Sequence, residues 1–439
     1  MIGAGCSLEP PTGLKLSSTY AREAHQQLLL DGVLDDGDCD DPDDLSAVAS
    51  AVWTKRGTQR AVVEQLPRNR FRNAQANPGY LVAAALLRER AVTAVLTLNF
   101  DLAMSNALGD LGADEVAVIS GPDTFSDLGS AVVVYLHRNV NETDLEAWIL
   151  RVEALETEWQ GRWEEVLAQR VMSCPIVVFA GLGSPAGVLT TTVSWVRERI
   201  DPRQHHAFVV DPADATLFQE VLNLPQDAYI QMGWCEFMQS LGDRLSAELR
   251  LVLERECRDL CTANSWDDEA EFVSGPCEAL YKLGLVSAGK VRAKWFLDSQ
   301  AYAPDDERRS LLADLVLGIS LLEHQAHAVV NVRSDGVVEL RRDGGLLGSF
   351  LPASGKGILN WAAMEPLIHQ TLQEFGSYDE PSAVLIAGIR GLLSQHDGPP
   401  DDVARGDTDA DIANGRDTPD FVTVDDLREN PSLIERLVS

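Results

Sequence analysis

The stretch AVTAVLTLNFD, residues 91–101, is a short apolar run that ends in polar side chains. Its β-branched residues and continuous apolar character predict a strand that is buried on both faces of a parallel sheet. Such a strand delivers the residues that follow it to the carboxyl edge of the sheet, where open α/β sheets bind their ligands. Asn99 and Asp101 are therefore candidates for a functional site.

Similar apolar runs recur over the first 240 or so residues. The expected strands are EVAVIS (115–120), AVVVYLH (131–137), one within CPIVVFAGLGS (174–184) and one within HHAFVVDP (205–212). The expected helices are 14–32, 45–63 with a break at Gly57, 79–90 after Asn77-Pro78, and one long helix over 144–171. Strands that alternate with helices predict an α/β fold with a Rossmann-like, doubly wound parallel sheet.

The chain opens with GAGCS, residues 3–7, a glycine turn of the kind that follows the first strand of nucleotide-binding domains. Only Met1 and Ile2 precede this turn, so the strand before it is cut short. We expect this strand at the centre of the sheet, where its absence would leave neighbouring strands unpaired. We therefore expect the natural start to lie several residues upstream of Met1. Cys6 within the turn is expected to pack rather than to act as a nucleophile.

The composition excludes several classes of partner. With 68 acidic against 36 basic residues the formal net charge is -32, which argues against a broad nucleic-acid or anionic-membrane surface. The seven scattered cysteines form no Cys-x-x-Cys pair, which indicates reduced thiols and no zinc site. No signal peptide is recognisable, and no apolar run approaches the roughly 18 residues of a membrane helix. We expect a cytoplasmic protein that binds neither membranes nor, directly, nucleic acid.

Beyond about residue 245 the pattern changes, and a mixed α/β, mostly helical domain is expected. Long helical segments precede a hairpin at 328–344, and two further helices are expected at 360–375 and 382–395. Segment 396–420 is rich in aspartate and poor in large apolar residues, which predicts a disordered linker. The expected division is thus a nucleotide-binding catalytic domain at 1–245, an oligomerisation or partner domain at 246–395, the linker, and a C-terminal segment at 421–439. That segment either docks on a partner or another copy, or packs as a short helix on its own domain.

Residues that could bind a ligand or take part in catalysis follow five successive expected strands. They are the turn of Gly3, Ala4, Gly5, Cys6 and Ser7, then Asn99 with Asp101, then His137, then the turn of Gly181, Leu182, Gly183 and Ser184, and finally Asp211. Each feature alone has an ordinary explanation as a turn, a helix cap or a structural histidine. Their recurrence in order at one edge of a parallel sheet predicts a single binding site.

The combination of GAGCS, TLNFD, LHR and GLGS resembles the sirtuin (silent information regulator) family over roughly residues 1–241. Two features depart from that family. The zinc-binding Cys-x-x-Cys pairs of sirtuin deacylases are absent, and Arg138 rather than glycine follows His137. In this the chain resembles the zinc-less sirtuin-like domains of bacterial antiphage defence, and the resemblance implies an NAD+ hydrolase rather than a deacylase.

The resemblance also implies a role for each residue toward NAD+, which would be the substrate, with no metal involved. Asn99 would orient the attacking water or a ribose hydroxyl, Asp101 would accept from the nicotinamide carboxamide, and His137 would act as general base. The backbone amides of residues 3–7 would cradle the pyrophosphate. Ser184, the backbone of Gly181 and Gly183, and Asp211 would hold the adenosine ribose.

These implications favour cleavage of NAD+ to ADP-ribose and nicotinamide, which would deplete NAD+ during phage infection. An enzyme that is always active would poison its host, so a homo-oligomer and a regulating partner are expected. The resemblance implies a hexameric DNA-translocase ATPase, a nucleotide signal or a prokaryotic Argonaute as candidates. A non-catalytic nucleotide-sensing or scaffold subunit stays open as the alternative, since the first strand is short and Arg138 replaces glycine. A protein deacylase is disfavoured by the missing zinc module.

Overall fold

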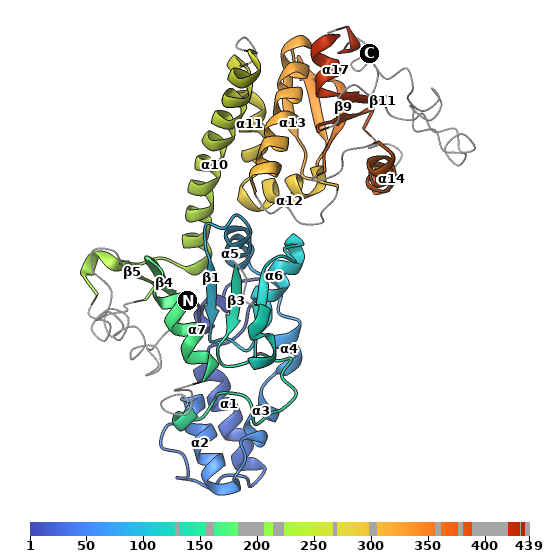
Figure 1. Cartoon of the computed structure of the whole chain (residues 1–439). Helices are drawn as coiled ribbons and strands as arrows, with labels where there is room; N and C mark the ends of the chain where they lie inside the picture. Colours follow the sequence, from blue (N-terminus) through green and yellow to red (C-terminus); the bar gives the residue numbers. More distant parts are fainter. Residues whose placement is uncertain are drawn as a thin grey trace. The chain divides into compact units, whose positions relative to one another are not determined.

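The computed structural model describes residues 1–127, 131–154, 162–182, 206–213, 224–266, 270–297, 305–355, 361–375, 381–388, 420–430 and 432–434. The chain divides into two compact units (Figure 1). Unit 1 comprises residues 1–110 and 114–241, and unit 2 comprises residues 111–113 and 242–439. Both contain helices and parallel strands, so the chain has a mixed α/β fold.

Unit 1 is built on short parallel strands. They are β1 (Ala94–Thr97), β2 (Ala117–Ile119), β3 (Val132–Tyr135), β4 (Ile176–Ala180), β5 (His206–Val210) and β6 (Tyr229–Ile230). The strands form two parallel groups, in the orders β1-β3-β2 and β4-β5-β6. All five strands expected from the sequence in this unit are confirmed, and the parallel arrangement is compatible with a Rossmann-like fold.

Residues 1–3 fill the gap between the two groups of strands. Ile2 forms parallel bridges to Thr97 of β1 and to Ala180 of β4. The Ile2 amide donates to the Leu96 carbonyl at 2.8 Å, and the Gly3 amide donates to the Ala180 carbonyl at 3.0 Å. The central position expected for the first strand is therefore confirmed. The order of strands reverses around Ile2, which makes this point the topological switch where α/β sheets bind ligands.

Helices surround these strands. They are α1 (Ser17–Leu30), α2 (Leu45–Arg56), α3 (Arg60–Gln65), α4 (Arg68–Arg72), α5 (Pro78–Arg88), α6 (Ala103–Leu111) and α7 (Trp163–Met172), with short 3-10 turns η1 (Ala4–Ser7), η2 (Pro122–Asp127) and η4 (Gln226–Ala228). The expected break at Gly57 is confirmed, because this residue ends α2 with a φ of 67°. The side chain of Asn77 caps α5 by accepting from the Tyr80 amide at 3.1 Å.

The single helix expected over 144–171 is wrong. Residues 144–150 form a turn-rich segment, α7 begins only at Trp163, and residues 155–161 lie outside the described ranges. The side-chain amide of Gln59 donates to the carbonyl oxygens of residues 145, 146 and 148 at 2.9, 3.2 and 2.8 Å. Because these carbonyls are held by Gln59, they do not build a helix. Trp148 stacks on Phe100 at 4.8 Å, so the apolar spacing reflects burial rather than helical structure.

Unit 2 contains a five-stranded mixed sheet in the order β11-β10-β9-β8-β7. The strands are β7 (Val329–Val332), β8 (Val338–Arg342), β9 (Gly345–Ala353), β10 (Ala383–Ile386) and β11 (Asp420–Thr423). The helices are α10 (Trp234–Asn264), which begins in unit 1, α11 (Ser274–Tyr281), α12 (Leu285–Trp295), α13 (Asp306–Gln325), α14 (Trp361–Leu372) and α17 (Val424–Glu429). The expected hairpin is confirmed as the antiparallel pair β7 and β8.

The helix expected at 382–395 is also wrong where the structure describes it, because residues 383–386 form the strand β10. Ala383 and Leu385 join the core on the side of α13, while Val384 and Ile386 join the cluster that contains residues of α14. A strand buried on both faces has no alternation of polar and apolar residues, so its apolar run cannot be distinguished from a buried helix by periodicity. Residues 389–395 lie outside the described part of the chain.

The C-terminal segment packs on its own unit. Strand β11 pairs in parallel with β10, and Val422, Val424 and Leu427 are buried in the core that contains α13. Thr423 and Asp426 form a capping box at the start of α17. Of the two alternatives for 421–439, packing on the same chain is what the structure shows for the described residues 421–430 and 432–434. The linker expected at 396–420 lies outside the described residues except for Asp420.

Candidate functional site

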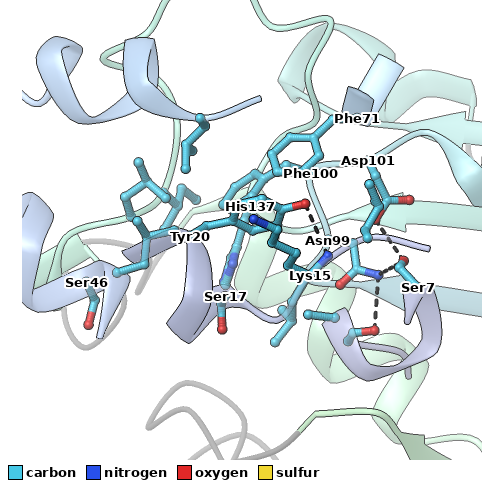
Figure 2. Close-up of a pocket in the computed structure, with 18 of the residues that line it drawn as sticks. Ser7, Lys15, Ser17, Tyr20, Ser46, Phe71, Asn99, Phe100, Asp101 and His137 are labelled. Carbon is cyan, nitrogen blue, oxygen red and sulfur yellow. Dashed lines mark hydrogen bonds between the residues drawn. The ribbon is translucent and has the colours of Figure 1, made fainter. Parts of the chain in front are cut away.

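A cavity of about 420 Å³ lies at the carboxyl ends of the central strands of unit 1 (Figure 2). Its volume falls within the range of small-molecule sites. Of the residues predicted from the sequence, Gly3, Ala4, Ser7, Asn99, Asp101 and His137 line it. A second wall is largely apolar and consists of Leu14, Tyr20, Leu66, Phe71, Phe100, Ile149, Leu150 and Val152. The strand ends therefore bring the predicted polar residues together, opposite a surface that can exclude water.

The orientation of the Asn99 side chain is defined by three acceptors. Its amide nitrogen, Nδ2, lies 3.1 Å from the Gly3 carbonyl oxygen, 3.3 Å from Ser7 Oγ and 3.1 Å from Tyr80 Oη. The amide oxygen has no hydrogen-bond partner among the described residues, and Figure 2 shows it on the side of the amide away from Ser7. Asn99 therefore offers the cavity an acceptor for a hydroxyl group or a water molecule.

Both carboxylate oxygens of Asp101 already accept hydrogen bonds from the protein. Its Oδ2 accepts from Ser7 Oγ at 2.9 Å, and its Oδ1 accepts from the Ala103 amide at 3.0 Å, at the start of α6. The side chain is 6% exposed, and this burial raises the pKa of the carboxyl group. The resemblance implies that Asp101 accepts a hydrogen bond from the nicotinamide carboxamide. Asp101 would have to accept that bond in addition to the two that it already accepts.

His137 follows β3 and is held by its backbone, because its carbonyl oxygen accepts from the Ile149 amide at 3.4 Å. The half-buried imidazole has no hydrogen-bond partner among the described residues. Burial, with a smaller effect from the positive charge of Arg138, lowers the pKa of His137 to about 4. The ring is thus neutral at pH 7 and can accept a hydrogen bond or a proton.

Arg138 occupies a backbone position that suits glycine, since its φ is 71°. Arg138 is kept in this conformation by a buried ion pair, in which its guanidinium lies 2.9 Å from Glu164 and 5.0 Å over the ring of Trp163. The residue that follows His137 therefore has a left-handed backbone conformation although it is not glycine.

Arg138→Gly is expected to be about 1 kcal/mol more stable than Arg138→Ala, because only glycine adopts positive φ without a steric penalty. Both substitutions remove the same ion pair and leave Glu164 buried without its partner, so both should be less stable than the parent. The free energies of unfolding in urea measure the difference. An alanine variant as stable as the glycine variant would contradict the assigned backbone conformation.

The glycines of the GAGCS turn are required by packing between two loops. A Cβ atom on Gly3 would lie 2.6 Å from the Gly181 carbonyl oxygen, and one on Gly5 would lie 2.7 Å from the Gly181 Cα. The amides of Gly3, Gly5 and Cys6 donate to the carbonyls of Ala180, Gly181 and Gly3, at 3.0, 2.8 and 3.0 Å. A pyrophosphate cradle made of all five amides is therefore not supported at these three positions.

The remaining predicted residues lie away from the cavity or outside the described chain. Cys6 is fully buried with its thiol against the Ala180 carbonyl, and burial raises the pKa of this thiol, as a packing role requires. Asp211 follows β5 as expected, but its carboxylate accepts from the Ala213 amide at 2.9 Å and does not line the cavity. Gly181 contacts the GAGCS turn. Gly183 and Ser184 lie outside the described residues.

Two residues near the site were missed by the sequence analysis. Tyr80 contributes a hydroxyl beneath Asn99, but its helix is apolar and offers no signal beyond core packing. Lys15 is the one lysine or arginine among the described residues that line the cavity, and its ammonium pairs with Glu23 at 2.5 Å. Its position after the glycine turn was the only signal that the sequence offered.

No protein-family model matches this chain, and no curated protein matches it. Within the part of the chain that the structure describes, no helix is long and apolar enough to cross a bilayer. The same described ranges contain no group of three or more His, Cys, Asp or Glu side chains placed to hold a metal ion.

Proposed function

We propose that unit 1 is an NAD+ glycohydrolase of the zinc-less, sirtuin-like kind, which converts NAD+ and water to ADP-ribose, nicotinamide and a proton. One observation carries this proposal. The free amide oxygen of Asn99 and the neutral imidazole of His137 belong to one cavity at the switch point of a parallel sheet. These residues come from different strand ends, and the motif resemblance assigns the same pair to this reaction.

The chemistry suits these groups. Nicotinamide in NAD+ is a cationic leaving group, so its bond to the ribose carbon breaks through an oxocarbenium-like state without a strong acid. Asn99 would orient the attacking water or a ribose hydroxyl through its amide oxygen. His137 would accept the proton that the water loses and then release it to solvent, as a weak base with a pKa of about 4, so it would contribute less than the about 10²–10⁴-fold of a base matched to the working pH. The apolar wall would keep bulk water away from the reacting carbon.

Among the parts of NAD+, the phosphates have the fewest available binding groups in the described part of the cavity. The amides of Gly3, Gly5 and Cys6 already have acceptors, and Lys15 already has Glu23 as a partner. A phosphate would have to compete with Glu23 for the Lys15 ammonium, or use the amide of Ala4 at the start of η1. The same observation weakens phosphate binding in the alternative, a non-catalytic nucleotide-sensing or scaffold subunit.

By the motif resemblance alone, we further propose a cytoplasmic effector of antiphage defence that depletes NAD+. It would act as a homo-oligomer under a regulating partner, such as a hexameric DNA-translocase ATPase. Unit 2, which carries no feature of the proposed reaction among its described residues, is the candidate for this oligomerisation or partner contact.

Incubating the purified full-length chain with NAD+ and separating the products by chromatography tests the proposal. We expect equal amounts of nicotinamide and ADP-ribose, and no acyl-ADP-ribose when an acetylated peptide is added. Saturable NAD+ binding in calorimetry without any nicotinamide release would support the non-catalytic alternative. Absence of both binding and cleavage would overturn both readings of the cavity.

A further inference from the structure

Tyr80 lies beneath the cavity and forms a directed chain of hydrogen bonds with the proposed catalytic amide. The single hydroxyl proton of Ser7 goes to Asp101, so Ser7 Oγ must accept from Tyr80 Oη, which lies 2.7 Å away. The Tyr80 oxygen in turn accepts from Asn99 Nδ2 at 3.1 Å. The chain of donors is therefore Asn99, Tyr80 and Ser7, and it ends on the Asp101 carboxylate, which only accepts.

This chain, together with the Gly3 carbonyl, decides which end of the Asn99 amide faces the cavity. If the amide were flipped, its oxygen would lie against the carbonyl oxygen of Gly3, and two acceptors would face each other. Burial raises the pKa of Tyr80 well above its ordinary value, so the phenol keeps its proton throughout any practical pH range. Tyr80 can therefore act only as a fixed hydrogen-bonding group, and not as an acid or base.

The first turn of α10 packs against Tyr80. Trp234, the first residue of α10, makes an edge contact with the Tyr80 ring at 5.9 Å between centroids. A Cβ atom on Gly79 would lie 2.3 Å from the Trp234 indole nitrogen, so glycine is required there although alanine suits a helix better. The Cys235 amide donates to Glu9 Oε1 at 3.0 Å, which ties the same turn to the loop that follows η1.

We propose that Tyr80 is the positioning residue that orients the Asn99 amide oxygen into the cavity, and that Trp234 at the start of α10 holds Tyr80 in place. The inference rests on the proposed function for its kinetic consequence, but the orientation of Asn99 is a property of the protein alone. Trp234 is the first of the 31 residues of α10, which ends at Asn264.

Tyr80→Phe tests the first part, with Tyr135→Phe as the matched control. Tyr135 is also fully buried and loses one hydrogen bond, to Ser105 at 2.9 Å, but it does not contact Asn99 or the cavity. We expect both variants to be less stable than the parent, and Tyr80→Phe to lose more stability because it loses two hydrogen bonds rather than one. Tyr80→Phe alone should lower kcat for NAD+ by up to about 10²-fold, with little change in KM, because a misplaced reacting group lowers the rate of the chemical step.

A second measurement does not need enzyme activity. The side-chain NH2 signals of Asn99, assigned by their loss in Asn99→Ala, should shift in Tyr80→Phe and Trp234→Leu and stay in place in Tyr135→Phe. An active parent with equal kcat in Tyr80→Phe and Tyr135→Phe would overturn the inference and leave the proposed function intact. With an inactive parent the proposed function fails, and the Asn99 signals alone decide: unchanged signals in Tyr80→Phe overturn the role of Tyr80, and unchanged signals in Trp234→Leu overturn that of α10.

Discussion

Asn99→Ala is expected to lower the rate of NAD+ cleavage by about 10²–10³-fold, the usual loss when one preorganised polar group is removed from a reaction centre. The substitution deletes the free amide oxygen, so the water or ribose hydroxyl loses its acceptor. It also deletes the donor shared by Gly3, Ser7 and Tyr80, and these groups remain hydrogen-bonded to one another only in part. Steady-state release of nicotinamide measures the effect.

The matched control is Asn69→Ala, because Asn69 is exposed on α4 and its side chain takes no part in the cavity. This control should keep the parental rate. His137→Ala should also lower the rate, but by a smaller factor, since the proposed base has a pKa of about 4 and is weak at neutral pH. Circular dichroism separates loss of function from loss of fold. Folded Asn99→Ala and His137→Ala variants that both turn over NAD+ at the parental rate would show that the reaction occurs elsewhere.

Gly181→Ala is expected to destabilise unit 1 by about 2–5 kcal/mol, from the steric penalty at positive φ and the overpacking of a filled space. The φ of Gly181 is 61°, and an added Cβ would lie 2.5 Å from the Cys6 amide nitrogen and 2.9 Å from its sulfur. The loops cannot separate without breaking the bond of 2.8 Å from the Gly5 amide to the Gly181 carbonyl. Because Gly3 and Ala4 line the cavity, the site should be distorted together with the fold.

Gly57→Ala is the control for this prediction. Gly57 also has a positive φ, of 67°, but an added Cβ would meet no atom within 4 Å. It should therefore lose only about 1–2 kcal/mol, the conformational part of the penalty. The difference between the two variants in urea unfolding measures the contact between the GAGCS turn and the loop after β4. Equal destabilisation would mean that the two loops are not packed as described.

The sequence predicted the central part of the site because its signals are local. A buried parallel strand is recognisable from a few β-branched residues, and the residues that follow it lie at one edge of the sheet by construction. Asn99, His137 and Gly3 were found in this way. Asp211 follows the same rule and still lies off the cavity, because the rule places strand ends at one edge but does not say how far along that edge the cavity extends.

By itself, then, the sequence determined the α/β class of unit 1, the position of its strands and the meeting of Asn99 with His137. Only the tertiary structure decided that 144–150 is not helical, that 383–386 is a strand, and that the buried Tyr80 joins Gly3 and Ser7 in contacting the Asn99 amide. The physical reason is the same in each case. Apolar spacing reports that a residue is buried, whereas the partner of a buried amide or carbonyl, such as Gln59 for the carbonyl of Trp148, comes from a distant part of the chain.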